Sequence, residues 1–146
     1  MENGEVFINS FETVFEKVLQ LKISEVHSKY QEPVFDGEKP VAALDFNGDM
    51  SGQLVMVLKA DEIAPILDVI LKKFDLQIPI APIAVFSELL NIYSGNVITT
   101  LAPYGKKINI TPPREIGDDM PHGRAYVVTL FTEVGYIIKF CFYLNK

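Results

Sequence analysis

The chain has 146 residues, of which 49% are hydrophobic and 22% charged, the composition of an ordinary globular protein with room for one core. Thirteen basic residues against nineteen acidic ones leave a net charge of −6, which argues against a nucleic-acid-binding surface because such surfaces are basic. Residues 1–146 are therefore expected to form one domain that does not bind nucleic acid.

Residues that could bind a metal or form a disulfide are scarce. Cys141 is the only cysteine, and His27 and His122 are the only histidines, so we expect neither an intrachain disulfide nor a metal site built from clustered cysteines or histidines. The N-terminal residues are acidic and lead into no apolar segment of the secretory type, and no apolar run is long enough to cross a bilayer. A cytoplasmic location without membrane insertion is the resulting expectation.

The first predicted element is a helix. Asn9 and Glu12 have the spacing of a capping box, and apolar residues then recur at helical intervals as far as Val26. Turn-forming residues follow Pro33. We therefore expect a helix over residues 10–30.

The other elements follow from local patterns of the same kind. Asn47-Gly48 between two apolar runs is typical of a hairpin turn, and Pro82 suits the first turn of a helix. The elements expected are, in chain order, a hairpin over 41–46 and 52–58, a helix over 61–74, a Pro-rich connection over 78–82, a helix over 83–101, a strand over 106–111, a loop over 114–123 and a hairpin over 124–132 and 136–144.

The order of helix, connection and hairpin in residues 10–58 recurs in residues 82–144, which predicts an internal duplication although residue identities barely repeat. The resulting fold class is α+β, with an antiparallel β-sheet built from hairpins and helices packed on it.

The helix over 83–101 carries the most information about function. At about 100° per residue, its small and polar side chains fall on one stripe of an otherwise apolar helix, and Asn and Gly are poor helix formers that call for a reason. The alternative is that the stripe is only the solvated face, with glycine allowing close packing. The stripe consists of Ala84, Ser87, Glu88, Asn91, Ser94 and Gly95.

Glu88 and Asn91 are three residues apart, so a carboxylate and a carboxamide lie side by side on the stripe. A carboxylate can pair with a cation, and a carboxamide can donate and accept at once and so orient a water molecule. The pair includes no nucleophile and no metal. A reaction that it assists must take both from its substrate, as in phosphoryl transfer beside another protein's Mg²⁺.

The run from Ser87 to Asn96 has the pattern Glu-x-x-Asn-x-x-x-Gly-Asn, and Pro112-Pro113 follows downstream. This pattern resembles the CheC/CheX/FliY family of chemotaxis phosphatases, and CheX most, because only one half of the chain carries the motif. In the first helix the equivalent place is residues 16–19, with Leu19 where the Asn would be. The resemblance in element order covers nearly the whole chain.

The resemblance implies a phosphatase that acts on a phosphorylated CheY-like response-regulator receiver. Asn91 would position water in line with the aspartyl phosphate and Glu88 would pair with the receiver's lysine. The chain would need no cofactor of its own, since the receiver supplies Mg²⁺. Ala84, Ser87, Ser94 and Gly95 would border the pair as a partner-binding surface.

One departure from the family pattern leaves a second function open. Many family members carry Asp or Ser where this chain has Ala84. The alternative is a non-catalytic module that binds receivers or acts as a scaffold in a chemotaxis or two-component system.

A homodimer is also expected, from the resemblance to CheX and from the apolar residues on both faces of the hairpin over 124–144. An uncovered edge strand there would need a second chain. A calcium site over Asp45, Asn47 and Asp49 is a weaker alternative, because Met50 and Met56 stand where such a loop needs Gly and Glu; a hairpin is the preferred interpretation.

Overall fold

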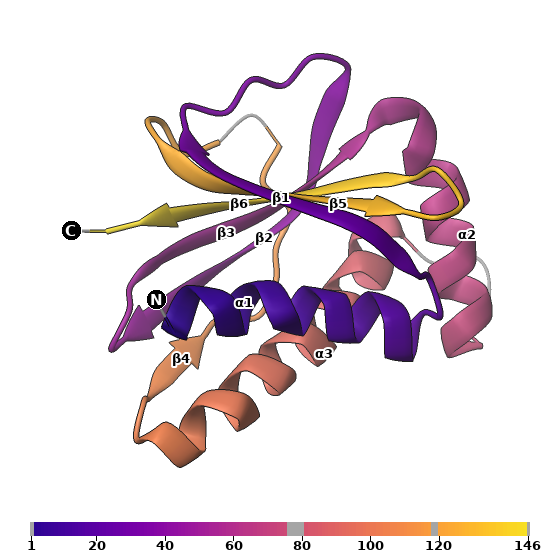
Figure 1. Cartoon of the computed structure of the whole chain (residues 1–146). Helices are drawn as coiled ribbons and strands as arrows, with labels where there is room; N and C mark the ends of the chain where they lie inside the picture. The colour runs from indigo at the N-terminus through magenta and orange to yellow at the C-terminus, as the bar shows by residue number, and fades with distance from the viewer. Residues whose placement is uncertain (1, 76–80, 118–119, 146) are drawn as a thin grey trace.

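The computed structural model of the chain describes residues 2–75, 81–117 and 120–145, which form one six-stranded antiparallel sheet with helices packed on it (Figure 1). The α+β prediction is confirmed. Residues 78–80 of the predicted Pro-rich connection and residues 118–119 of the predicted loop lie outside the described residues. The strands are β1 (Ile23–Gln31), β2 (Glu38–Gly48), β3 (Gly52–Lys59), β4 (Ile108–Ile110), β5 (Ala125–Thr132) and β6 (Ile137–Leu144). The helices are α1 (Glu2–Thr13), α2 (Ile63–Phe74) and α3 (Pro82–Leu101), with short helical turns η1 (Val14–Val18), η2 (Ala60–Glu62) and η3 (Ala102–Tyr104).

The first helix is where the sequence-based prediction is wrong. The helix already begins at Glu2, so Asn9 is not its cap, and it ends after the π-helical turn η1, where Gln20 has a φ of 57°. Residues 23–30, expected as its last turns, belong to β1. A β-bulge between Ile23 and Glu25 places Ile23 and Val26 against the same core. This spacing of three in a bulged strand mimics the i, i+3 spacing of a helix.

The strand order supports the predicted duplication. The sheet runs β1-β5-β6-β3-β2-β4, and exchanging β1 with β4, β2 with β5 and β3 with β6 gives the same order reversed. The two halves of the chain are therefore interleaved about a pseudo-two-fold axis, with the β5–β6 hairpin and the β2–β3 hairpin side by side.

The two faces of the sheet are covered in different ways. α1 and α3 lie together on one face and α2 lies beside them (Figure 1), over a core that includes Leu54, Phe140 and Phe142. The other face has a smaller apolar cluster, including Val55 and Cys141, which is covered by Ile116 and by partly buried side chains of the connecting segments.

This arrangement corrects the reason given for a dimer. β5 and β6 lie inside the sheet, flanked by β1 and β3, so they form no uncovered edge. Most of their apolar residues on both faces are covered within the chain, and the exceptions are Tyr126 and Leu144, which are 38% and 40% exposed. None of the helices among the described residues has the length and apolar character needed to cross a membrane.

Candidate functional site

The helix that carries the candidate site begins and ends at clear local signals. Ala81 is extended, with φ −62° and ψ 138°, and Pro82 takes the first helical position, where its missing N–H needs no partner. After Leu101 the chain makes the turn η3 and reverses at Gly105, which has a φ of 72°. Both positions agree with the prediction of a helix over 83–101.

The rotation of α3 about its axis is set by aromatic stacking. Tyr93 stacks on Phe11 of α1 with ring centroids 4.2 Å apart and planes within 5°, and Phe11 stacks in turn on Phe140 of β6 at 3.6 Å. Burial raises the pKa of the Tyr93 hydroxyl well above its ordinary value. Because Tyr93 points into the core, the residues on the opposite side of α3 point to solvent.

The predicted stripe is only partly on that solvent side. Ala84, Glu88, Asn91 and Gly95 are exposed, and Ser87 is half-buried. Ser94 is only 8% exposed, so the expectation that it borders an open surface is wrong. Ser94 follows Tyr93 on the edge of the stripe nearest the core, where the neighbouring elements cover it.

Glu88 and Asn91 form the centre of the exposed part. Within the described part of the chain, neither side chain has a hydrogen bond or an ion pair, so Asn91 caps no backbone group there. Glu88 is also the only charged side chain of α3. A carboxylate and a carboxamide are thus held by a rigid helix at solvent-facing positions, free to meet groups of another molecule.

One residue of this surface was missed by the sequence analysis. Ile98 is 42% exposed, and it continues the line of Ala84, Glu88, Asn91 and Gly95, whose spacings alternate between four and three residues. Such alternation keeps side chains in a nearly straight row along a helix. The signal was present in the sequence, but the predicted stripe included only small and polar residues and so left Ile98 out.

The corresponding part of the first half is used for packing. Glu16 accepts a hydrogen bond from the backbone N–H of Ile23 at 3.3 Å, and Leu19 is 3% exposed. These residues close the turn between η1 and β1. The first half therefore presents no second exposed carboxylate and carboxamide at this place.

The polar residues of the β2–β3 turn have partners within the chain, as expected for a hairpin. Asp49 accepts a hydrogen bond from the backbone N–H of Lys107 at 2.7 Å, and Asn47 accepts one from the Asn109 side chain at 3.3 Å. Asp45 pairs with Arg114 at 3.1 Å. The three side chains thus hold β2 against β4 and the segment that follows, which includes Pro112-Pro113.

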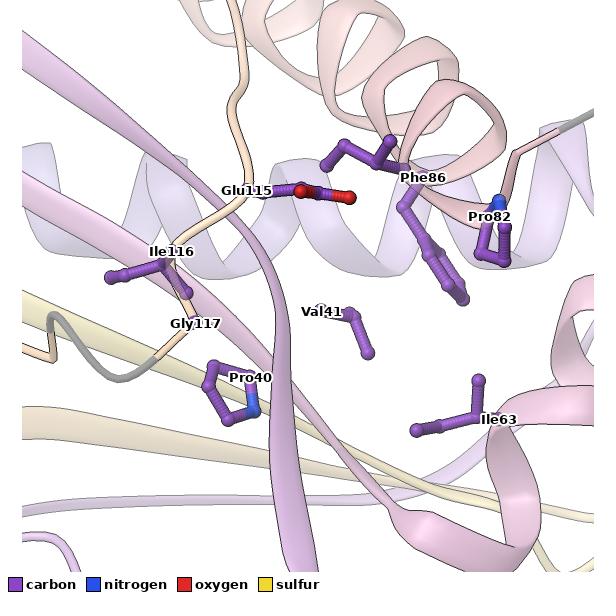
Figure 2. A pocket seen from close by; sticks show the side chains of 9 residues that line it. Pro40, Val41, Ile63, Pro82, Phe86, Glu115, Ile116 and Gly117 are labelled. Atoms are coloured by element: carbon purple, nitrogen blue, oxygen red, sulfur yellow. The ribbon is translucent and has the colours of Figure 1, made fainter.

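A pocket of about 300 Å³ lies at the first turn of α3 (Figure 2). Phe86 and Glu88 are two residues apart, about 200° around the helix, so the pocket opens on the other side of α3 from Glu88. Glu115 is its only charged lining residue. The pocket is lined by Pro40, Val41, Ile63, Pro82, Ile83, Phe86, Glu115, Ile116 and Gly117.

The remaining nucleophile and base candidates lie apart from this surface. Cys141 is buried in β6, and burial raises the pKa of its thiol to about 12, so the thiol is protonated and unreactive near neutral pH. His122 is exposed in the segment before β5. Neither residue is brought to α3 by the strand order.

No protein-family model and no curated protein sequence matches the chain, but solved structures match its fold over nearly its whole length. The CheX of Borrelia burgdorferi, solved in a complex with CheY, BeF3 and Mg²⁺, aligns with a TM-score of 0.71 and 19% identity over 100% of this chain and 99% of that chain. A CheC-like superfamily protein from Shewanella sp. PV-4 aligns with a TM-score of 0.69 and 16% identity over 97% of both chains. FliY of Thermotoga maritima aligns with a TM-score of 0.62 and 19% identity over 97% of this chain and 86% of that chain.

The fold is therefore that of the chemotaxis proteins of the CheC/CheX/FliY class. Among them, CheX structures match over essentially their full length, which confirms the resemblance found in the Glu-x-x-Asn helix. At identities of 16–19% the likeness is one of fold, and the roles of Glu88 and Asn91 are argued from their own chemistry below.

Proposed function

We propose that this protein is a phosphatase that accelerates dephosphorylation of a CheY-like response-regulator receiver in the cytoplasm. The observation that carries the proposal is that Glu88 and Asn91 are both exposed on one face of α3, a helix whose orientation is fixed by the Tyr93–Phe11 stack. The known complex of a CheX with CheY, BeF3 and Mg²⁺ supports a receiver as the partner.

The proposed mechanism assigns each side chain a role suited to its chemistry. The Asn91 carboxamide enters the receiver's active site and holds a water molecule in line with the phosphorus, which the Mg²⁺ of the receiver keeps electrophilic. Water attacks phosphorus, the bond from phosphorus to the aspartyl oxygen breaks, and inorganic phosphate and the free carboxylate result. Glu88 pairs with the receiver's lysine and so fixes the position of Asn91.

The test is to replace Asn91 with alanine. Because Asn91 is exposed, Asn91→Ala leaves the fold intact, and because a water-positioning group acts mainly in the transition state, the maximal rate of dephosphorylation should fall about 100-fold with little change in receiver affinity. The measurement is loss of phosphate from a panel of phosphorylated receivers. If the wild-type chain accelerates none of them, the proposal is wrong.

The alternative function is receiver binding without catalysis, and the observation in its favour is that Ala84 brings no polar group to the exposed face. In that case Glu88→Ala would weaken complex formation, while neither Glu88→Ala nor Asn91→Ala would change the lifetime of the aspartyl phosphate. Affinity and phosphate lifetime measured on the same variants separate the two functions.

We propose in addition that the protein is a homodimer joined through β1. β1 is at the end of the strand order, so one of its edges is unpaired, and most of its side chains are exposed. Glu25 and Lys29 lie symmetrically about His27 on one face of the strand. When two copies of β1 pair in antiparallel fashion about His27, each Glu25 lies opposite the other copy's Lys29, and opposite charges across a strand pair are stabilising.

A further inference from the structure

Gly95 differs from the other glycines whose surroundings the structure describes, because none of the described residues requires a glycine there. Six of the others have a positive φ that L side chains rarely adopt: Gly37, Gly48, Gly105, Gly117, Gly123 and Gly135. A Cβ at Gly48 would meet the Lys107 carbonyl, and one at Gly52 would meet the Tyr143 carbonyl. Gly95 lies inside a regular helix with nothing within 4 Å of a Cβ built on it.

Glycine at this position weakens the chain that contains it. In a helix interior glycine is among the least favourable residues, because it loses most backbone freedom on folding and buries no side chain. The suggestion that Gly95 permits close packing within the chain is excluded by the open space around it. The described residues therefore give no structural reason for a small residue at this position, and the open space leaves room for a molecule that approaches α3 from outside.

The neighbours of Gly95 indicate which molecule that is. Gly95 is one turn after Asn91, and Ile98, 42% exposed, continues the same row. From Glu88 to Ile98 the row is about 15 Å long. This length is shorter than the width of a compact patch of roughly 800 Å², the area that one partner covers in a standard interface. A partner that places its active site over Asn91 therefore also lies over Gly95 and Ile98.

We infer that the receiver packs directly against the backbone of α3 at Gly95 and covers Ile98 with an apolar part of its surface. This inference rests on the proposed function and adds the part of the interface that sets affinity. The receiver surface that fits has a lysine for Glu88 beside its phosphorylated aspartate and, one turn along α3, an uncharged, flat region that matches Gly95 and Ile98.

The decisive variant is Gly95→Leu, which adds bulk where the isolated chain has open space. A better helix former should raise Tm by about 2–4 °C, and at the same time Kd for a CheY-like receiver loaded with BeF3⁻ and Mg²⁺ should rise at least about 10-fold. Ile98→Ser should also raise Kd. Two matched controls should leave Kd unchanged: Lys73→Leu, which adds a leucine to the exposed side of α2, and Val134→Ser, which removes an apolar side chain that is 66% exposed in the β5–β6 turn.

The outcomes separate this inference from the proposed function. A Gly95→Leu variant that binds the receiver as tightly as the wild type, or one whose Tm falls, would overturn the inference while leaving dephosphorylation by the wild type intact. A wild-type chain that accelerates no receiver overturns the proposed function and the inference with it. Two results together support the proposed function and the inference. Gly95→Leu should be more stable than the wild type but bind the receiver less tightly, and Asn91→Ala should dephosphorylate the receiver more slowly while binding it with unchanged affinity.

Discussion

At the scale of single residues, one ion pair is largely buried. The Lys139 ammonium on β6 lies 2.7 Å from the Glu38 carboxylate at the start of β2, and the two side chains are 18% and 9% exposed. The pair passes over β3, which lies between these strands. Two charges with so little water around them depend on each other, because either one alone would be poorly solvated.

Removing one partner of this pair should therefore be costly. We expect Glu38→Ala to lower the free energy of unfolding by about 3 kcal/mol, since it leaves the Lys139 ammonium without its carboxylate. The control is Lys72→Ala, which breaks the Lys72–Asp68 pair whose side chains are 77% and 59% exposed and should cost no more than about 0.5 kcal/mol. Urea denaturation of both variants measures the difference, and equal losses would contradict the prediction.

The candidate site could be predicted at this scale because it depends on local helix geometry. Glu88 and Asn91 are three residues apart on a helix whose apolar side chains identify the buried face. Ser94 was wrongly included and Ile98 was left out because the stripe was defined by residue type. The true boundary depends on which elements pack on α3, and those come from distant parts of the chain.

At the scale of elements, the contact between α1 and α3 depends on Phe11. Its ring lies between Tyr93 and Phe140 and is 1% exposed. Phe11 thereby links the helix that carries the candidate site to the central strand β6. The stack transmits the position of the sheet to the orientation of Asn91.

Truncation of Phe11 should be among the most damaging single changes. We expect Phe11→Ala to lower the free energy of unfolding by about 3–5 kcal/mol, because it opens a cavity in the centre of the core. Tyr104→Ala, at a side chain that is 74% exposed, should change it by no more than about 0.5 kcal/mol. Thermal or urea denaturation followed by circular dichroism compares the two, and a Phe11→Ala chain as stable as Tyr104→Ala would show that the stack contributes little.

The unpaired edge of β1 gives a prediction that uses charge reversal. Glu25→Lys and Lys29→Glu should each give monomers, because each places like charges opposite one another in the proposed strand pair. An equimolar mixture of the two variants should form heterodimers, since the lysines of one variant then face the glutamates of the other. Analytical ultracentrifugation or light scattering measures the mass. If the single variants remain dimers, the dimer interface is not at β1. If the wild type is a monomer, the proposal of a homodimer is wrong.

The hairpins and the helices α2 and α3 were predictable because their signals lie within a few residues of each other. β1 was not, because a strand at the edge of a sheet with most side chains exposed has little apolar alternation, and its bulge reproduces helical spacing. Its partner β5 is far away in the sequence. Local patterns contain no information about such a pairing.

At the scale of the whole molecule, three buried acidic groups make the fold sensitive to alkaline pH. Burial raises the pKa of the Cys141 thiol to about 12 and that of the Tyr143 hydroxyl to about 12, and it raises the pKa of Tyr93 as well. In the unfolded chain these groups lose their protons at lower pH. Above the unfolded pKa values the unfolded chain therefore binds fewer protons than the folded chain, and stability falls as pH rises.

We expect the free energy of unfolding to fall by on the order of 3 kcal/mol between pH about 9 and pH about 11. Urea midpoints measured across this pH range test the prediction. Cys141→Ala provides the control, because the free energy of unfolding of this variant should fall less steeply with pH, by the contribution of one proton. A stability that stays level up to pH about 11 would show that these groups are not protected by burial.

The interleaved sheet has a consequence for how the chain folds as it is synthesised. β1 is paired only with β5, where Ile23 lies opposite Thr132, and β3 is joined to that side of the sheet only through β6. While the ribosome is still adding the residues before β5, the N-terminal strand has no neighbour and the β2–β3 hairpin has one open side. The sheet can close only when residues 125–144 have emerged, so nascent chains stalled before residue 125 should remain sensitive to proteases over residues 23–31, and chains in which residues 125–144 have emerged should be protected there.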